Sequence, residues 1–256
     1  MKPLSIISLL IIMIAACSGP PKPETISGYP ASAKVDTVDE YFGEKVPDPY
    51  RWMENDTTQQ VADWVKAQNE VTFGFLDKIP YRAAIKKRLE DLNNYEKIGS
   101  PFKRGDFIYY YKNSGLQNHS VLFRKKGEQG QEEVFLDPNT FSKDGTTRLA
   151  GVSFSKDGSR VAFQISRGGA DWTDAIVMNA IDKTILEDTI RDIKFSGIAW
   201  KGNDGFYFST YEKPKGSQLS AKTQSHKLYY HKVATPRNED KLIFGDDKNP
   251  RRYVGG

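Results

Sequence analysis

Two stretches of the chain share one pattern, and this pattern restricts the chain to a repeated set of antiparallel strands. The stretches are "GVSFSKDGSRVAFQI" (residues 151–165) and "GIAWKGNDGFYFST" (residues 197–210). Each opens on glycine followed by an apolar, a small and an aromatic residue, and then reaches Asp-Gly before an alternating run. Because glycine tolerates positive φ, we expect tight hairpin turns at Asp157-Gly158 and Asp204-Gly205.

A weaker copy, "SPFKRGDFIYYY", occupies residues 100–111, so that Phe102, Phe154 and Trp200 stand at equivalent positions, 52 and 46 residues apart. Each copy is followed by a further strand-like run, at residues 119–126, 174–180 and 226–233. A unit of three or four short strands that recurs every ~40 to 50 residues predicts β-propeller blades. A β-sandwich is the alternative, since its strands are similar but need no fixed period. Only about three blades fit, and a closed propeller needs at least about four.

The region before the repeat, residues 35–98, predicts two helices. Thr57 and Gln60 have the spacing of a capping box, and apolar residues then recur at helical intervals until Pro80. A second helix is expected from an apolar stripe at i, i+4 and i+7 that begins at Ile85. The sequence therefore predicts a mainly β fold that follows a helical N-terminal segment.

The first twenty residues have the pattern of an export signal. Lys2 precedes an apolar stretch that is shorter than the ~20 residues a helix needs to cross a bilayer. The small residues directly before Cys17, the only cysteine, resemble the lipobox of bacterial lipoproteins, in which the cysteine is lipidated. We expect a lipoprotein signal peptide at 1–16, a Pro-, Ser- and Gly-rich tether at 17–34, and an exported, periplasmic, membrane-anchored product. An ordinary signal peptide with a chance cysteine is the alternative.

The residues by themselves form no recognisable catalytic constellation. No G-x-S-x-G elbow of a serine hydrolase occurs, and its nearest match, Ser153, lies in an expected strand and is interpreted as structural. His119, His226 and His231 are interpreted as surface or strand residues; the last two, five apart in a strand, point to opposite faces and cannot share a metal. No motif indicates a cofactor. The net charge of +4 is spread over interleaved basic and acidic residues, which argues against a nucleic-acid partner.

A family resemblance adds to this reading. The stretch "YFGEKVPDPYRWMEND" (residues 41–56), followed by "WVKAQN" (residues 64–69), resembles the N-terminal signature of the prolyl oligopeptidase family of serine peptidases. The resemblance continues in that family's order through "GLQNHSVLF", "VFLDPN", "IKFSGIAW" and "HKLYYHKV", and covers nearly all of residues 37–256. It implies an α/β-hydrolase domain into which a seven-bladed propeller is inserted.

On that plan, residues 35–98 are a helical segment of the peptidase domain, and residues 99–256 are the first blades of an incomplete seven-bladed β-propeller. The resemblance also implies that the catalytic Ser, Asp and His lie downstream of residue 256, and that this chain alone is inactive. The partners implied are short proline-containing peptides and the missing hydrolase portion of the same protein.

Three positions match substrate-side residues of that family. Phe195 matches an aromatic residue that lines the pocket for the peptide residue two before the scissile proline. Val254 matches an apolar position in the same wall, and Asp171 matches an acidic residue that faces a substrate-clamping arginine. The residues alone favour a core aromatic at Phe195, and only the resemblance favours the pocket.

Three hypotheses follow. In the first, the chain is the N-terminal part of an exported prolyl oligopeptidase that cleaves short peptides after proline through an acyl-enzyme. In the second, it is a propeller lipoprotein that binds peptides or proteins without catalysis. In the third, it is a non-functional truncation, because three blades leave open sheet edges.

Overall fold

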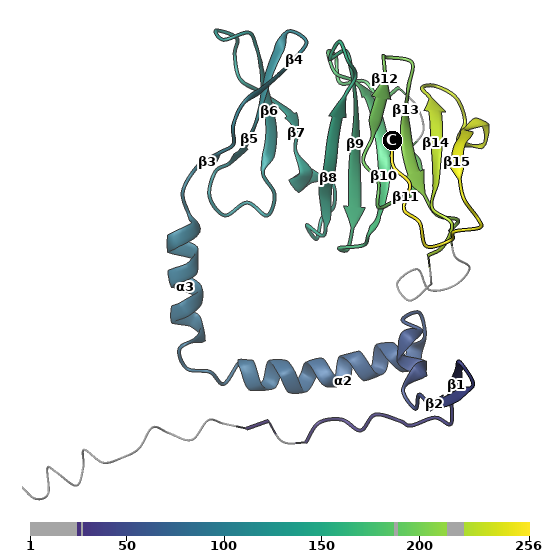
Figure 1. Cartoon of the computed structure of the whole chain (residues 1–256). Helices are drawn as coiled ribbons and strands as arrows, with labels where there is room; N and C mark the ends of the chain where they lie inside the picture. Colours follow the sequence, from purple (N-terminus) through teal and green to yellow (C-terminus); the bar gives the residue numbers. More distant parts are fainter. Residues whose placement is uncertain (1–24, 27, 187–188, 214–222) are drawn as a thin grey trace, which may run out of the picture. The chain divides into compact units, whose positions relative to one another are not determined.

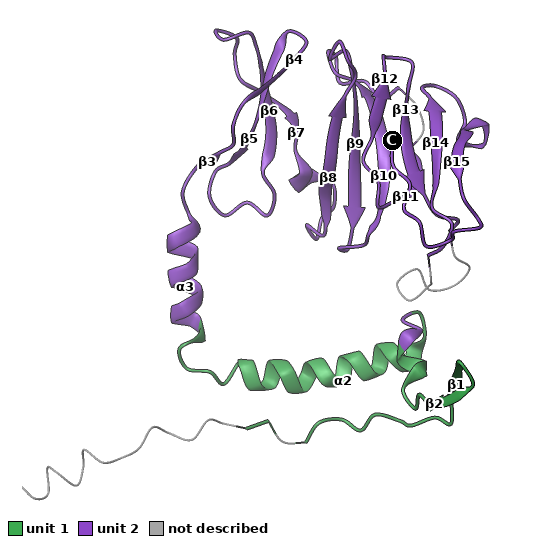
Figure 2. Ribbon diagram, viewed as in Figure 1, with its two compact units in different colours: residues 1–53, 57–82 green, residues 54–56, 83–256 purple. Residues whose placement is uncertain are grey.

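The structure is a computed structural model that describes residues 25–26, 28–186, 189–213 and 223–256 (Figure 1). It divides into two units, residues 1–53 with 57–82 and residues 54–56 with 83–256 (Figure 2). In the part of the chain that the structure describes, no helix has the length and apolar character needed to span a membrane. Cys17, the expected lipidation site, and the expected signal peptide lie outside the described residues.

The first unit contains one long helix. A hairpin of β1 (Val38–Tyr41) and β2 (Glu44–Pro47) is followed by the short η1 (Arg51–Glu54) and by α2 (Gln59–Leu76). The helix begins at Gln59 because the Thr58 hydroxyl oxygen accepts the Val61 N–H at 3.3 Å. The expected cap at Thr57 is therefore wrong by one residue, although the helix itself is confirmed.

The second expected helix is α3 (Arg82–Asn93), which lies almost wholly in the second unit. Its apolar stripe of Ile85, Leu89 and Leu92 is about half exposed, at 51%, 54% and 52%. On its polar side, Lys86 pairs with Glu90 and Lys87 pairs with Asp91. Ion pairs within the helix therefore stabilise it, and no other described element buries its apolar stripe.

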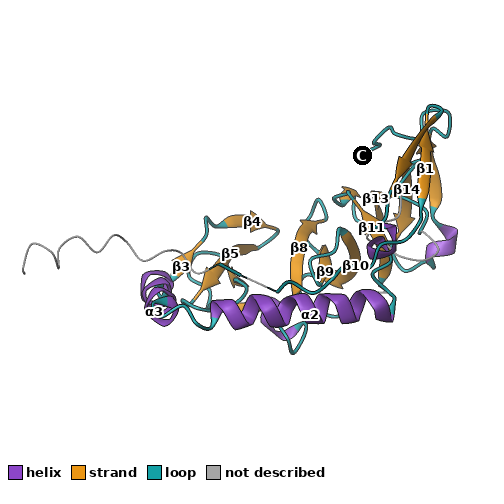
Figure 3. Ribbon diagram, turned by 90° about the horizontal axis from the view of Figure 1, so that it is seen from below, coloured by secondary structure: helices purple, strands orange, loops and turns teal. Residues whose placement is uncertain are grey.

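Three antiparallel sheets make up the rest of the second unit, and strands dominate it (Figure 3). Each sheet follows the chain as a meander, and we call the sheets blades 1, 2 and 3. Blade 1 contains β3 (Lys97–Ile98), β4 (Phe102–Arg104), β5 (Phe107–Asn113), β6 (Val121–Lys126) and β7 (Glu133–Leu136). Blade 2 contains β8 (Thr147–Phe154), β9 (Arg160–Arg167), β10 (Trp172–Asn179) and β11 (Ile190–Lys194). Blade 3 contains β12 (Ala199–Lys201), β13 (Gly205–Thr210), β14 (Lys227–Lys232) and β15 (Lys241–Gly245). Two short 3-10 helices, η2 (Pro138–Thr140) and η3 (Arg237–Glu239), complete the unit.

The repeated aromatic position is confirmed. Phe102 pairs with Tyr109, Phe154 with Val161, and Trp200 with Phe206, in each case across the first hairpin of a blade. The further runs that the repeat predicts become β6, β10 and β14, in each blade the strand that follows the first hairpin. The sequence period therefore corresponds to one antiparallel blade.

One predicted turn is wrong. The turn between β8 and β9 contains Gly158 with φ +76°, as expected, but the turn between β12 and β13 has its positive φ at Gly202 (+60°). Gly205 is instead the first residue of β13, where an added Cβ would lie 2.2 Å from the His231 carbonyl oxygen. Glycine is needed there for close strand contact and not for turn geometry.

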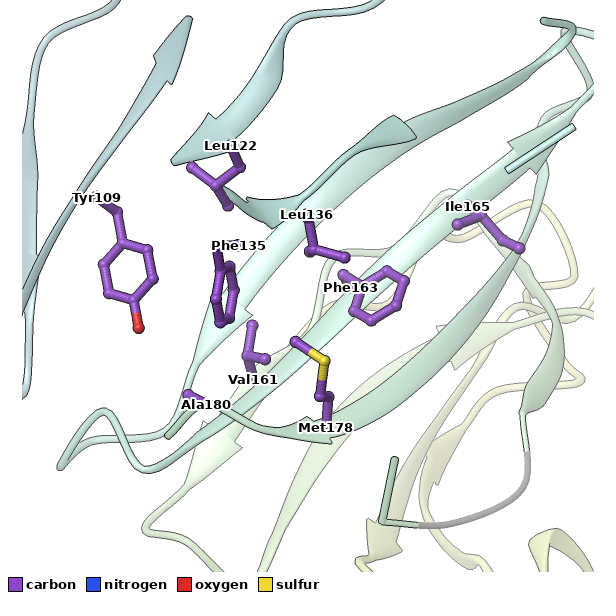
Figure 4. Packing of buried hydrophobic residues seen from close by; sticks show 9 residues of the cluster. All are labelled: Tyr109, Leu122, Phe135, Leu136, Val161, Phe163, Ile165, Met178 and Ala180. Atoms are coloured by element: carbon purple, nitrogen blue, oxygen red, sulfur yellow. The ribbon is translucent and has the colours of Figure 1, made fainter. Parts of the chain in front are cut away.

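The core lies between successive blades. Blade 2 is covered on both faces, so that Val161 and Phe163 of β9 pack towards blade 1 while Ala162 packs towards blade 3. Figure 4 shows the cluster between blades 1 and 2, which contains Tyr109, Leu122, Phe135, Leu136, Val161, Phe163, Ile165, Met178 and Ala180. The burial on both faces explains why residues 161–166 are all buried rather than alternating.

Neighbouring blades also meet through their first hairpin turns. An added Cβ on Gly158 would lie 2.4 Å from the backbone nitrogen of Gly105, which is the turn glycine of blade 1. On the other side, the Asn203 amide of blade 3 donates to Asp157 at 2.5 Å. Ser153, interpreted as structural, donates to the Ile198 carbonyl of blade 3 at 2.9 Å, which supports that interpretation.

These contacts decide between the two folds that the repeat allows. Three successive meanders are stacked face to face, whereas a sandwich would have two sheets. The described sheets do not close into a ring. The fold is an incomplete β-propeller.

Candidate functional site

The three predicted substrate-side residues lie at the end of blades 2 and 3. Asp171 directly precedes β10, and Phe195 directly follows β11. Trp172 and Lys194 are cross-strand partners in this pair, so Asp171 and Phe195 leave the sheet at the same end. Val254 lies in the segment after β15, which runs back across blade 3 to bring Gly256 against Leu228 and Tyr207. The roles suggested for Phe195, Val254 and Asp171 stay predictions.

Phe195 has an unusual backbone. Its φ is +52°, a left-handed conformation that costs a bulky non-glycine residue about 1 kcal/mol or more. Its side chain is nevertheless 48% exposed, so burial of the ring does not account for this cost. Strain of this kind gathers at binding and catalytic sites, where the surrounding structure imposes it.

Hydrogen bonds to the next residue, Ser196, hold Phe195 in this conformation. The Gln164 side-chain amide donates to the Ser196 carbonyl at 3.0 Å and also to the Thr173 hydroxyl at 3.0 Å. The Ser196 hydroxyl in turn accepts the Ser209 N–H from β13 at 2.7 Å. Blades 2 and 3 therefore hold the turn from both sides, and Phe195 is presented in a fixed orientation.

An aromatic cluster extends from Phe195. Its ring lies edge-on to Tyr211 with centroids 6.3 Å apart and tilted against Tyr253 at 6.1 Å. His226 stacks on Tyr211 at 4.4 Å and lies edge-on to Tyr253 at 5.7 Å. The cluster thus joins Phe195 to the segment that carries Val254.

His226 is the centre of this cluster, and the interpretation of it as a surface residue is wrong. It is 2% exposed and lies one residue before β14. Its Nδ1 accepts the Val254 N–H at 3.1 Å, and its Nε2 lies 3.1 Å from the Lys194 carbonyl oxygen. These partners assign a neutral imidazole that carries its proton on Nε2. His226 thereby fixes the distance between the Phe195 turn and Val254.

His231 is also buried, and it lies within β14, which agrees with its interpretation as a strand residue, but it is not part of this cluster. It packs on Phe206 and its Nδ1 is 2.6 Å from Asp240. The third histidine, His119, is half-buried with its Nε2 3.0 Å from the Gly145 carbonyl oxygen. Among the described residues, no group of three or more His, Cys, Asp or Glu side chains is placed to hold a metal ion.

The neutral state of His226 predicts a pH dependence of stability. Burial lowers the pKa of the His226 imidazole, and the hydrogen bond to the Lys194 carbonyl opposes this only partly. Because the unfolded imidazole titrates near its ordinary pKa of about 6.5, the unfolded chain binds more protons than the folded chain below that pH. We expect the free energy of unfolding to fall on acidification from pH 7.5 to 5.5, by about 1 kcal/mol from this group.

Urea unfolding at the two pH values measures this effect. In His226→Phe the acid-induced loss should shrink by the same amount. An equal loss in the parent and in His226→Phe would contradict the assignment of a buried neutral imidazole.

Lys194 and Trp172 complete the site. Lys194 is 7% exposed, and its Nζ lies 4.9 Å from the Trp172 ring centroid and 5.0 Å from that of Phe195. Trp172 is 8% exposed. Asp171, one residue earlier, is exposed and forms no hydrogen bond or ion pair with the described residues.

Sequence reasoning identified Phe195 of the aromatic cluster but missed the site roles of Tyr211, His226 and Tyr253. Tyr211 and Tyr253 carry no motif, and His226 lies in a segment recognised only as a strand. The signal that could have found Lys194 is the pairing of β10 with β11, which requires the register of the two strands.

The proteins that this chain resembles in sequence are prolyl oligopeptidases and prolyl endopeptidases. The family model described as the prolyl oligopeptidase N-terminal β-propeller domain matches residues 30–256. A prolyl endopeptidase of Elizabethkingia miricola is 51% identical over 229 residues, which cover 89% of this chain and 32% of that protein. Prolyl oligopeptidase A of Amanita bisporigera is 32% identical over 259 residues, covering 89% of this chain and 34% of that protein. The chain spans about a third of the length of the curated relatives it matches.

Solved structures agree with the fold. Prolyl oligopeptidase B from Galerina marginata bound to a 25mer macrocyclization substrate superposes with a TM-score of 0.73 and 29% identity. The match covers 89% of this chain and 35% of that one. With a family model that matches most of its length and three stacked blades in the expected order, the chain belongs to the prolyl oligopeptidase family and carries its N-terminal β-propeller domain.

Proposed function

We propose that this chain is the propeller-bearing N-terminal part of an exported prolyl endopeptidase that cleaves short peptides on the C-terminal side of proline. The identity of 51% to a prolyl endopeptidase supports the reaction class. The observation that carries the site is Phe195, a half-exposed aromatic ring held in a left-handed backbone conformation beside the segment of Val254. Export and a lipid anchor at Cys17 are part of this proposal, supported by the lipobox-like N-terminus.

In this proposal the chemistry is divided between two parts. A serine of the α/β-hydrolase portion attacks the carbonyl carbon of the proline while a histidine takes the serine proton. The histidine gives this proton to the amine of the following residue, which leaves as the scissile C–N bond breaks, and water then hydrolyses the acyl-enzyme. The propeller residues contribute binding. Phe195 and Val254 form an apolar wall against the peptide residue two before the scissile proline, and Asp171 orients the arginine that clamps the substrate.

The test compares Phe195→Ala with the parent in a polypeptide that contains both this propeller segment and the hydrolase portion. With a fluorogenic Leu-Gly-Pro peptide, we expect kcat/KM to fall about tenfold, since partial loss of a buried aromatic contact costs about 1.4 kcal/mol. Stability should fall only slightly, because the Phe195 side chain is 48% exposed and both residues carry the Cβ that makes the left-handed conformation costly.

Leu116→Ala is the matched control, because Leu116 is a similarly exposed apolar residue in blade 1, and it should leave kcat/KM unchanged. Residues 1–256 alone should not hydrolyse the peptide. Absence of prolyl cleavage by the longer polypeptide would instead favour a propeller that binds peptides without catalysis.

A further inference from the structure

Two hydrogen-bond donors at the candidate site lack an acceptor within the described residues. Trp172 Nε1 is sealed from solvent and has no hydrogen-bond partner among them. Lys194 lies across the strand pair from Trp172 and is 7% exposed, yet no ion pair or hydrogen bond of its Nζ occurs in the same part of the chain. The contacts of this ammonium that the structure describes are with the ring faces of Trp172 and Phe195.

This arrangement is costly without an acceptor. A buried donor that makes no hydrogen bond costs about 1–3 kcal/mol, and a charged donor costs more. Contact with aromatic faces recovers only part of that, about 1–2 kcal/mol for a desolvated cation. Since Nζ is not among the sealed unpartnered atoms, it keeps some contact with solvent and can be reached from outside.

Carboxylates of the neighbouring strands do not fill this position, because they are engaged by other cations. Asp174 of β10 pairs with Arg167 and lies 3.7 Å from Arg191. Asp192 of β11 pairs with Lys213 at 2.8 Å. Asp171, exposed at the same end of the strand pair, forms no ion pair with Lys194 and is left to the substrate-clamping arginine in the proposed function. The Lys194 ammonium therefore has no carboxylate partner among the described residues beside the exposed ring of Phe195.

We propose that Lys194 receives a carboxylate side chain of the bound peptide, so that this corner of the site favours an acidic residue two before the scissile proline. The proposal rests on the peptidase function proposed above. A carboxylate oxygen can accept from the Lys194 ammonium, whereas the sealed Trp172 indole N–H stays out of the peptide's reach.

The position of the corner fits this ligand. The Lys194 stem is buried between the two rings, so its ammonium is held in place before the peptide arrives, which reduces the entropy lost on binding. The apolar part of a glutamate side chain would lie against Phe195 while its carboxylate reaches Nζ. Lys194 is thus a specificity-determining residue for the same peptide position that Phe195 contacts.

The experiment measures kcat/KM for the fluorogenic peptides Glu-Gly-Pro and Gln-Gly-Pro, N-terminally blocked, with the polypeptide that contains the propeller segment and the hydrolase portion. We expect about a tenfold preference for the glutamate peptide, the effect of one charge-assisted hydrogen bond. In Lys194→Met the preference should fall to about onefold. The preference should also weaken with added NaCl, since salt screens a charge that is open to solvent.

Two further variants keep the test independent of folding. Trp172→Phe keeps an aromatic face beside the ammonium and removes only the sealed indole N–H, so it should keep most of the preference. Lys201→Met is the matched control, because Lys201 is an exposed lysine over the Tyr230 ring in blade 3, and it should keep the parental preference. Equal cleavage of both peptides by the parent, or an unchanged preference in Lys194→Met, overturns the inference. If neither peptide is cleaved at all, the peptidase function itself is contradicted, and the role of Lys194 falls with it.

Discussion

Replacing Arg124 with methionine is expected to lower the free energy of unfolding by about 3 kcal/mol, because the carbonyls of Ala180 and Ile181 lose their hydrogen-bond donor and Glu133 loses an ion-pair partner. Arg124 belongs to β6 of blade 1 and is 3% exposed. Its guanidinium donates to the carbonyls of Ala180 and Ile181 in blade 2, the latter at 2.8 Å. Its charge also lies 4.3 Å from the Phe107 ring centroid.

The methionine keeps most of the apolar volume, so the loss reports on the hydrogen bonds rather than on a cavity. Urea unfolding of the parent, of Arg124→Met and of Arg148→Met measures it. Arg148 is an exposed arginine of β8, and its replacement should change stability by less than about 0.5 kcal/mol. A similar small change in Arg124→Met would mean that blades 1 and 2 do not depend on this contact.

Replacing Gly158 with alanine is expected to cost about 3 kcal/mol, while the same change at Gly202 should cost only about 1 kcal/mol. Both glycines have positive φ, +76° and +60°, in the first hairpin turn of their blades. A Cβ at Gly158 would meet the Gly105 backbone at 2.4 Å, whereas a Cβ at Gly202 would meet no atom within 4 Å. The difference between the two variants therefore isolates the contact between the turns of blades 1 and 2.

Chemical unfolding of the two variants, monitored by tryptophan fluorescence, gives this difference directly. Equal destabilisation would show that the turn of blade 1 can move away without loss. It would then contradict the view that the turns themselves hold neighbouring blades in place.

Much of the fold could be predicted from the sequence because each blade repeats the same local chemistry. An aromatic residue in the first strand, a polar turn and an alternating second strand recur at Phe102, Phe154 and Trp200, and the structure confirms all three positions. The errors occur where two similar residues compete. Thr57 and Thr58 both offer a capping hydroxyl, and Gly202 and Gly205 lie in one turn sequence, so only the backbone distinguishes them.

The candidate site was less accessible to sequence reasoning because its contacts join distant segments. Phe195 was singled out through a family resemblance, and its left-handed backbone has no sequence signal. His226 was misjudged because a histidine is usually exposed in a polar strand, and its partners, the Lys194 carbonyl and the Val254 N–H, lie 32 and 28 residues away. The pairing of Lys194 with Trp172 likewise depends on strand register.

The Arg124 contact has a consequence for synthesis of the chain. Its acceptor on Ala180 lies 56 residues further along, so at about 5–20 residues per second the ribosome delivers it roughly 3 to 11 seconds later. Glu133 of blade 1 can already pair with the guanidinium Nε, but the two terminal nitrogens that donate to blade 2 must stay hydrated during that interval, because burying an unpartnered donor is unfavourable. Blade 1 therefore cannot complete its inner face alone on the ribosome, and the smallest piece of this propeller able to finish folding during translation is a pair of blades.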